Sequence, residues 1–186
     1  MGRALKMAPF AVPVLALAAY VCFGQEKAPP RDRIPRVRPP EEVRAILPTP
    51  GLVYHRWLVG EGNHLFRAGA DGADEVRLTS DSNCRDPRWS ADGVNIAYMW
   101  GTASAGVQLH VIRGDGSGDR LVPTGDLDPM YPAWSPDGEL LAFTGEGDIW
   151  VVRPDGTGLT QLTDTRWTDS RPDWSPSGYS IVYEHP

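Results

Sequence analysis

Short apolar runs separated by turn-forming residues dominate the chain from residue 51 onward. The runs IAY (96–98), LAF (141–143) and IVY (181–183) consist largely of β-branched and aromatic residues, which favour strands. The chain has 186 residues, of which 20 are Gly and 18 are Pro. So many backbone-breaking residues argue against a helical bundle and predict many short strands joined by turns.

Two motifs recur three times each in this region. The first aligns without gaps on a Pro, a Trp, a Ser and a Gly in three segments: RDPRWSADGVNIAY (85–98), MYPAWSPDGELLAF (130–143) and SRPDWSPSGYSIVY (170–183). The second aligns on Asp-Gly in three segments: 65–79, 109–123 and 149–163. Self-similarity at a fixed period indicates a repeat architecture.

Each repeat predicts four antiparallel strands. Ser-Pro-Asp-Gly at 135–138 suits a type I turn between the first and second strands. The later Asp-Gly marks the hairpin between the third and fourth strands. Four strands in about 40 residues match one blade of a β-propeller. We therefore expect an all-β fold, a partial or open β-propeller of four-stranded antiparallel blades, with about three and a fraction blades.

The expected strands do not fill whole blades. They number three in 52–79, four in 86–125, four in 131–163 and two in 172–184, which makes 13. Even a propeller of four blades needs about 16 strands. In order of preference, the sequence is a fragment, an open arc, or a chain whose copies self-associate through open blade edges.

The N-terminal part of the chain has the layout of an export signal. Arg3 and Lys6 precede an uncharged, mostly apolar run at 8–23, so residues 1–24 are expected to be a signal peptide. The minority alternatives are lipidation at Cys22 and an uncleaved anchor. Residues 25–50, with seven Pro, are expected to be an extended linker. The mature protein would then be periplasmic or extracellular, without an integral membrane span.

The remaining region, 51–186, is the expected propeller domain, and it is acidic. It holds 10 Arg, no Lys and 20 Asp and Glu, a net charge of −10. Such a balance excludes a nucleic-acid partner bound by phosphate neutralisation. Cys84 is the one cysteine left after signal cleavage, so it forms no internal disulfide and is expected to be a small buried apolar residue.

Little in this domain indicates catalysis or a cofactor. Recurrence of Ser90, Ser135 and Ser175 at one turn position identifies them as structural, and the four His are expected to be strand or hairpin surface residues. Asp115, Ser117 and Asp119 resemble the start of a calcium loop, but the same turn recurs without those ligands. We expect no catalytic residue, no metal and no cofactor. The repeated tryptophans should pack between blades, whereas three others are better candidates for exposed contacts: Trp57, Trp100 and Trp167.

The repeats carry a family resemblance. The pattern PxWSPDGxxIAF followed by IWVVxPDGTGxxxLT resembles the propeller repeats of the TolB-like family, over about residues 52–186. The resemblance implies a propeller, typically of six blades in that family, and a periplasmic or extracytoplasmic location. It covers the blades alone, because residues 25–50 stand in the place of the N-terminal α/β domain of TolB.

Loops between blades supply the candidate site. In propellers, the loop from an outermost strand to the next innermost strand crosses one face toward the central channel; here these loops are 80–86, 124–130 and 163–170. The channel-mouth candidates for binding a cation or a basic peptide are Asp86, Asp126, Asp128, Arg166 and Asp169. The alternative, which we favour, is a solvated acidic face.

The function expected is an exported, non-enzymatic propeller module that binds a protein partner. The first alternative is the N-terminal propeller part of a larger hydrolase, such as a prolyl oligopeptidase-type peptidase, whose sequence would reach a G-x-S-x-G motif beyond Pro186. The second is part of a carbohydrate-active propeller enzyme, which would need metal-binding His clusters at the channel.

Overall fold

The computed structural model describes residues 51–102 and 106–186. The expected signal peptide (1–24) and linker (25–50) lie outside these described residues.

Thirteen strands form four antiparallel sheets within the described part of the chain. Their order and bounds are β1 (Leu52–Leu58), β2 (Gly62–Ala68), β3 (Val76–Arg77), β4 (Cys84–Trp89), β5 (Asn95–Thr102), β6 (Gly106–Arg113), β7 (Arg120–Val122), β8 (Met130–Trp134), β9 (Leu141–Gly145), β10 (Asp148–Val152), β11 (Thr160–Gln161), β12 (Ser170–Trp174) and β13 (Ile181–Glu184). The sheets contain three, four, four and two strands in chain order, which confirms the expected strand count and grouping.

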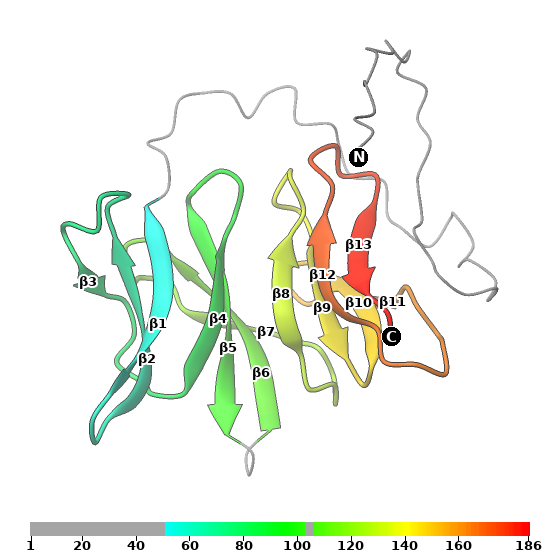
Figure 1. Cartoon of the computed structure of the whole chain (residues 1–186), viewed down its shortest axis with the longest axis horizontal. Helices are drawn as coiled ribbons and strands as arrows, with labels where there is room; N and C mark the ends of the chain where they lie inside the picture. Colours follow the sequence, from blue (N-terminus) through cyan, green and yellow to red (C-terminus); the bar gives the residue numbers. More distant parts are fainter. Residues whose placement is uncertain (1–50, 103–105) are drawn as a thin grey trace, which may run out of the picture.

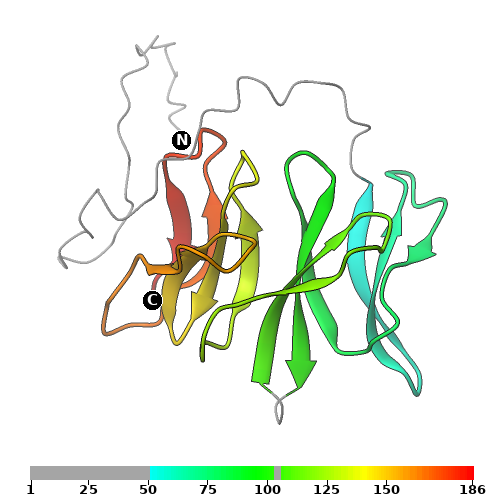
Figure 2. The same cartoon turned by 180° about the vertical axis from the view of Figure 1, so that it is seen from behind.

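The sheets follow one another as the blades of a propeller (Figure 1). β4, β8 and β12 are the first strands of their blades, and each contacts the next across the blade boundary, while β1 lies against β4. The view from behind shows the later strands of the second and third blades on the opposite side of the molecule (Figure 2). The innermost strands thus form one continuous wall.

Local turn chemistry explains the connections within blades. At 135–138, the Gly138 amide donates to the Ser135 carbonyl across 2.9 Å, and Gly138 has a φ of 72° that favours glycine. The Asp137 carboxylate accepts from the Ser135 hydroxyl at 2.7 Å and holds the turn closed. Ser135 is fully buried, which confirms a structural role.

Three apolar clusters fill the spaces between blades. Trp134 packs with Ala97 and Val111 of the second blade, and Trp174 packs with Ala142 and Ile149 of the third. This confirms that these repeated tryptophans pack between blades. Each cluster joins residues of two successive blades, so a blade is stabilised chiefly by its neighbours.

Candidate functional site: a groove along the innermost strands

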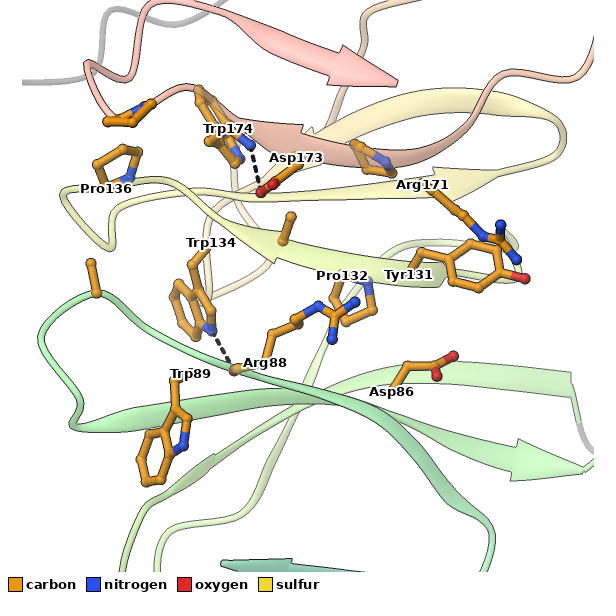
Figure 3. A pocket seen from close by; sticks show the side chains of 14 residues that line it. Asp86, Arg88, Trp89, Tyr131, Pro132, Trp134, Pro136, Arg171, Asp173 and Trp174 are labelled. Carbon is orange, nitrogen blue, oxygen red and sulfur yellow. Dashed lines mark hydrogen bonds between the residues drawn. The ribbon is translucent and has the colours of Figure 1, made fainter. Parts of the chain in front are cut away.

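A groove of about 910 Å³ runs across β4, β8 and β12 (Figure 3). Each strand contributes the residues around its repeated Pro-x-Trp segment. The lining residues that carry charge or an aromatic hydroxyl are Asp86, Arg88, Tyr131, Arg171 and Asp173. The groove therefore lies on strands, whereas the sequence had placed the candidate site in loops.

A β-bulge shapes every strand of the groove. The strand pairing shifts register across the repeated Pro and the residue before it in β4, β8 and β12. The residues at the shift are Asp86, Tyr131 and Arg171, whose φ values of 47°, 54° and 53° lie in the left-handed region. This conformation is uncommon for residues with a side chain. Its threefold recurrence shows that the fold imposes it.

Two of the three bulges have a hydrogen-bond partner in the preceding blade. The Tyr131 amide donates to the Met99 sulfur at 3.3 Å, and the Arg171 amide donates to the Thr144 hydroxyl at 3.1 Å. At the bulge, the backbone amide is not paired within its own sheet. It donates instead to a side chain of the preceding blade, which fixes the innermost strand to that blade. This contact holds Tyr131 and Arg171 at the groove.

The charged groups of the groove differ in how they are held. The Arg171 guanidinium donates to Glu184 at 3.1 Å and lies 5.0 Å from the centre of the Tyr131 ring. The Glu184 hydrogen bond raises the pKa of Arg171 above its ordinary value. Asp173 accepts the backbone amide of Trp174 at 3.0 Å. Arg88, on β4, is exposed.

The charged and aromatic groups of this surface suit the recognition of a bound chain. The described residues that line the groove include two Asp, two Arg, a Tyr, three Trp and several Pro and Ala, but no Ser, Cys, His or Lys. Nucleophilic catalysis in enzymes relies on a nucleophile beside a base. Charges of both signs beside aromatic rings instead suit hydrogen bonding and stacking with a bound chain.

The five channel-mouth candidates have different settings in the structure. Asp86 lines the groove, and the other four do not. Asp126 is exposed in the loop before β8, and Asp128 accepts the Val107 amide at 2.9 Å. Arg166 lies over the Trp167 ring at 4.8 Å, and Asp169 is fully buried against His185. The groove on β4, β8 and β12 therefore includes one of the five candidates.

The histidines do not share the expected surface setting. His55 is exposed, but His64 is 1% exposed and contacts the Arg77 guanidinium at 3.0 Å. His185 lies 2.6 Å from Asp169, and His110 lies 3.2 Å from Asp119. The surface assignment is wrong for His64, because the centre of β2 is buried on both faces and Arg77 supplies a partner there.

The acidic residues that resemble a calcium loop accept hydrogen bonds from other residues of the chain. Asp115 accepts the Ser117 amide at 2.8 Å, and Asp119 accepts the Tyr98 hydroxyl at 2.9 Å. Burial raises the pKa of Asp119, but hydrogen bonds from His110 and Tyr98 outweigh burial and hold it below its ordinary value. Across residues 51–102 and 106–186, no three His, Cys, Asp or Glu side chains lie close enough to hold a metal ion.

Two of the exposed-contact candidates remain at the surface. Trp57 is 63% exposed and Trp167 is 48% exposed. Trp100 instead packs against the cluster that contains Cys84 and Tyr98. None of the described segments contains a helix that is long and apolar enough to cross a membrane.

Sequence signals for the groove were present in the repeats. The framework Pro, Trp and Ser are the same in each copy, while the residue before Pro is Asp86, Tyr131 or Arg171. These three positions vary between the copies while their neighbours do not, which marks them as candidate positions for specific binding. All three side chains line the groove because of the bulge, and regular alternation along a strand does not predict a bulge.

Comparison with known proteins supports the fold. No family model matches the chain. It is 31% identical over 124 residues to "Uncharacterized peptidase YuxL" of Bacillus subtilis (strain 168), which covers 59% of this chain and 18% of that protein. It is 33% identical over 126 residues to "Protein TolB homolog" of Chlorobium luteolum, which covers 64% and 28%. The chain thus spans less than one third of the length of either relative.

A solved structure gives the same architecture. The structure of a TolB-type protein from Agrobacterium tumefaciens superimposes with a TM-score of 0.66 over 72% of this chain and 50% of that one, at 22% identity. At this identity the likeness concerns the fold. The blades, their repeats and these relatives together show that residues 51–186 form a β-propeller region similar to those of TolB proteins.

Proposed function

We propose that this chain is an exported, non-enzymatic protein-interaction module whose groove across β4, β8 and β12 binds an extended segment of a protein partner. One observation carries the proposal. Three structurally equivalent positions in the groove hold an acid, an aromatic and a base, namely Asp86, Tyr131 and Arg171, on an otherwise repeated framework. Because these three positions differ in chemistry, a bound segment fits in one direction and in one register.

The residues that follow the repeated Pro form a second row in the groove, in which the two charges stand in the opposite order. The residues after Pro are Arg88, Ala133 and Asp173, so β4 presents an acid then a base, while β12 presents a base then an acid. An extended peptide crossing these strands meets opposite charges at both ends of the groove and apolar Pro and Ala in the middle. Complementary charge of this kind contributes to specificity and association rate.

Export is supported by the sequence of the first 24 residues and by the likeness to a TolB homolog. A mature chain that begins at Gln25 in a secreted or periplasmic fraction is the expected result of N-terminal sequencing. Intact Met1 in the cytoplasmic fraction would contradict export and would leave the groove proposal to its own test.

The binding test places a photo-activatable cross-linking residue at Tyr131, with Leu121 on β7 as the control position outside the groove. We expect a defined protein to be captured from position 131 and not from 121. The purified partner should bind the chain, and Asp86→Arg should weaken binding at least about tenfold while Leu121→Arg leaves it unchanged. Equal capture at both positions, or equal loss with both variants, would overturn the proposal.

A second candidate function is supported by the likeness to the protein named as a peptidase in Bacillus subtilis. In this alternative the propeller belongs to a larger hydrolase and the groove guides substrate peptides. An in-frame genomic sequence beyond Pro186 that reaches a G-x-S-x-G motif would favour it. Hydrolysis of a panel of peptidyl p-nitroanilides by the purified chain would contradict the non-enzymatic proposal directly.

A further inference from the structure

The first blade departs from the repeat at one position that faces a blade boundary. The three Asp-Gly segments align without gaps, and their third residues are Arg67, Val111 and Val151. Val111 and Val151 are fully buried in the apolar clusters at the two later boundaries. Leu65, two residues before Arg67 on β2, belongs to the cluster between the first and second blades. Arg67 therefore directs a guanidinium toward a boundary where the later blades place valine.

The guanidinium of Arg67 has no partner in the described part of the chain. Its Nε atom is buried and has no hydrogen-bond acceptor there. Among the same residues, no carboxylate forms an ion pair with it. A buried donor of a charged group is destabilising when it is unpaired, and native proteins pair nearly all such groups. A ligand that supplies an acceptor would remove this cost.

A cavity of about 510 Å³ lies beside Arg67 at this boundary. The Trp89 ring forms one wall, and its indole N–H already donates to the Gly51 carbonyl at 2.9 Å. The ring packs so closely on Gly114 that an added Cβ there would come within 2.6 Å of it, which fixes its position. The small or apolar residues of the other walls are Ala68, Ala70, Gly93, Val94 and Gly114. The cavity therefore offers an apolar surface next to one cationic group.

The other charged residues of the cavity leave the charge of Arg67 unmatched. Asp115 accepts the Ser117 amide at 2.8 Å, and hydrogen bonds from Ser117, together with the nearby Arg113, lower its pKa. The charges of Arg113 and Asp115 thus offset each other. Asp74 also lines the cavity, but it is exposed in the loop between β2 and β3, where water solvates its carboxylate. An anion in the cavity would give Arg67 the partner that the described chain does not provide.

We propose that this cavity binds a small organic anion, which carries a carboxylate or phosphate group on an apolar body. The anionic group accepts hydrogen bonds from Arg67, whose planar fork suits both kinds of anion. The apolar body lies against the Trp89 ring. Small-molecule sites have volumes of about 300–1,000 Å³, and this cavity lies within that range. The proposal does not depend on the groove, although Trp89 lines both.

Titration of the full chain with three matched probes tests the ligand class. In ligand-observed NMR, benzoate, phenyl phosphate or both should bind saturably, and the ratio of their affinities identifies the anionic group. Benzamide has the shape of benzoate without its charge and should bind at least about tenfold more weakly, because it loses the charge-assisted hydrogen bonds. Equal affinity for benzamide and the anions, or no saturable binding of either anion, would overturn the proposal.

A substitution that follows the repeat tests the role of Arg67. Arg67→Val installs the residue of the later blades, so the variant should melt at a temperature no lower than the parent chain. It should bind the preferred anion at least about tenfold more weakly, because the guanidinium is gone. The matched control is Arg120→Val, at an exposed residue of β7 outside the cavity, and it should bind as the parent does. Parent affinity in Arg67→Val, or equal loss in both variants, would contradict the site. No protein partner enters these measurements, so their outcome is separate from that of the groove proposal.

Discussion

Trp134 donates its indole N–H to the backbone carbonyl of Arg88 across 3.1 Å and so joins the innermost strands of the second and third blades. The same ring packs with Ala97 and Leu109 of the second blade. One side chain therefore gives a blade boundary both its hydrogen bond and part of its apolar packing. The acceptor is a carbonyl of the groove wall, so blade packing and groove geometry depend on each other.

Replacing this side chain should be costly. Trp134→Ala removes the packing and the hydrogen bond, and we expect it to lower the free energy of unfolding by about 3–5 kcal/mol. Trp57→Ala, at a residue that is 63% exposed, should change it by less than about 0.5 kcal/mol. Urea unfolding followed by tryptophan fluorescence compares the two. Equal midpoints would mean that Trp134 does not hold the blades together.

Trp57 is a better control than Trp100, although the repeat pattern left both outside the framework. Trp100 packs against the first blade boundary and its ring centre lies 6.1 Å from that of His110. Its position in the sequence gave no sign of this contact, because the contact depends on how two sheets pack. An intermediate loss of stability is therefore expected for Trp100→Ala.

The blades were predictable from the sequence because their determinants are local. Ser135 and Gly138 close a turn with each other, and equivalent Ser and Gly residues recur in every copy. The groove was less predictable. Its key residues lie at bulges, and a bulge reverses the alternation that would otherwise assign Tyr131 to a face of the sheet.

Buried polar pairs were the least predictable feature. Asp169 looked like a solvated acid in a loop, but it is fully buried because His185, 16 residues later, reaches it. His64 is buried because Arg77 lies on the neighbouring strand. Such pairs join residues that are distant in sequence, and neither residue type indicates burial by itself.

The Asp169–His185 pair yields a second prediction. His185→Ala leaves a buried carboxylate without its main partner and should lower the free energy of unfolding by about 1–3 kcal/mol. Adding Asp169→Asn to this variant should recover part of the loss, because the remaining group is neutral. Glu184→Gln, which affects the exposed contact with Arg171, should cost less than about 1 kcal/mol. Chemical denaturation measures all three, and no recovery in the double variant would contradict this account.

Cys84 gives a pH-dependent prediction. Burial raises the pKa of its thiol to about 11, whereas an unfolded cysteine ionises near its ordinary value of about 8.5. Because the folded pKa is the higher one, the stability contributed by the neutral thiol is present below about pH 8.5 and is lost as pH rises toward 11. The free energy of unfolding should therefore fall in this interval, and fall less steeply in Cys84→Ala.

Alkylation of Cys84 checks the same burial independently. Iodoacetamide at about pH 8 should leave Cys84 unmodified in the folded chain and should modify it in concentrated urea, because the thiolate is the reactive species and the folded chain buries it. Rapid modification of the folded chain would show that the thiol is accessible. The pH dependence would then need another source.

The outward face of the last blade differs from the same face of the blades before it. Ala97 and Ala142 are fully buried, because Trp134 and Trp174 of the following blades pack on them. Val182 holds the equivalent position on β13 and is 62% exposed. β13 also has one hydrogen-bonded neighbour, β12, among the described strands. An exposed apolar residue beside open backbone groups promotes association.

We therefore propose that the isolated chain self-associates, or aggregates, through the face of β13. Light scattering on the chain from residue 25 onward should give a mass that rises above that of a monomer with concentration. Val182→Glu should shift the mass toward the monomer, because association would bury a charge without a partner. Val59→Glu, at a hairpin residue that is 96% exposed, is the matched control and should leave the mass unchanged. A concentration-independent monomer with a cooperative melt at high temperature would contradict the proposal, and would mean that the described blades form a self-sufficient arc.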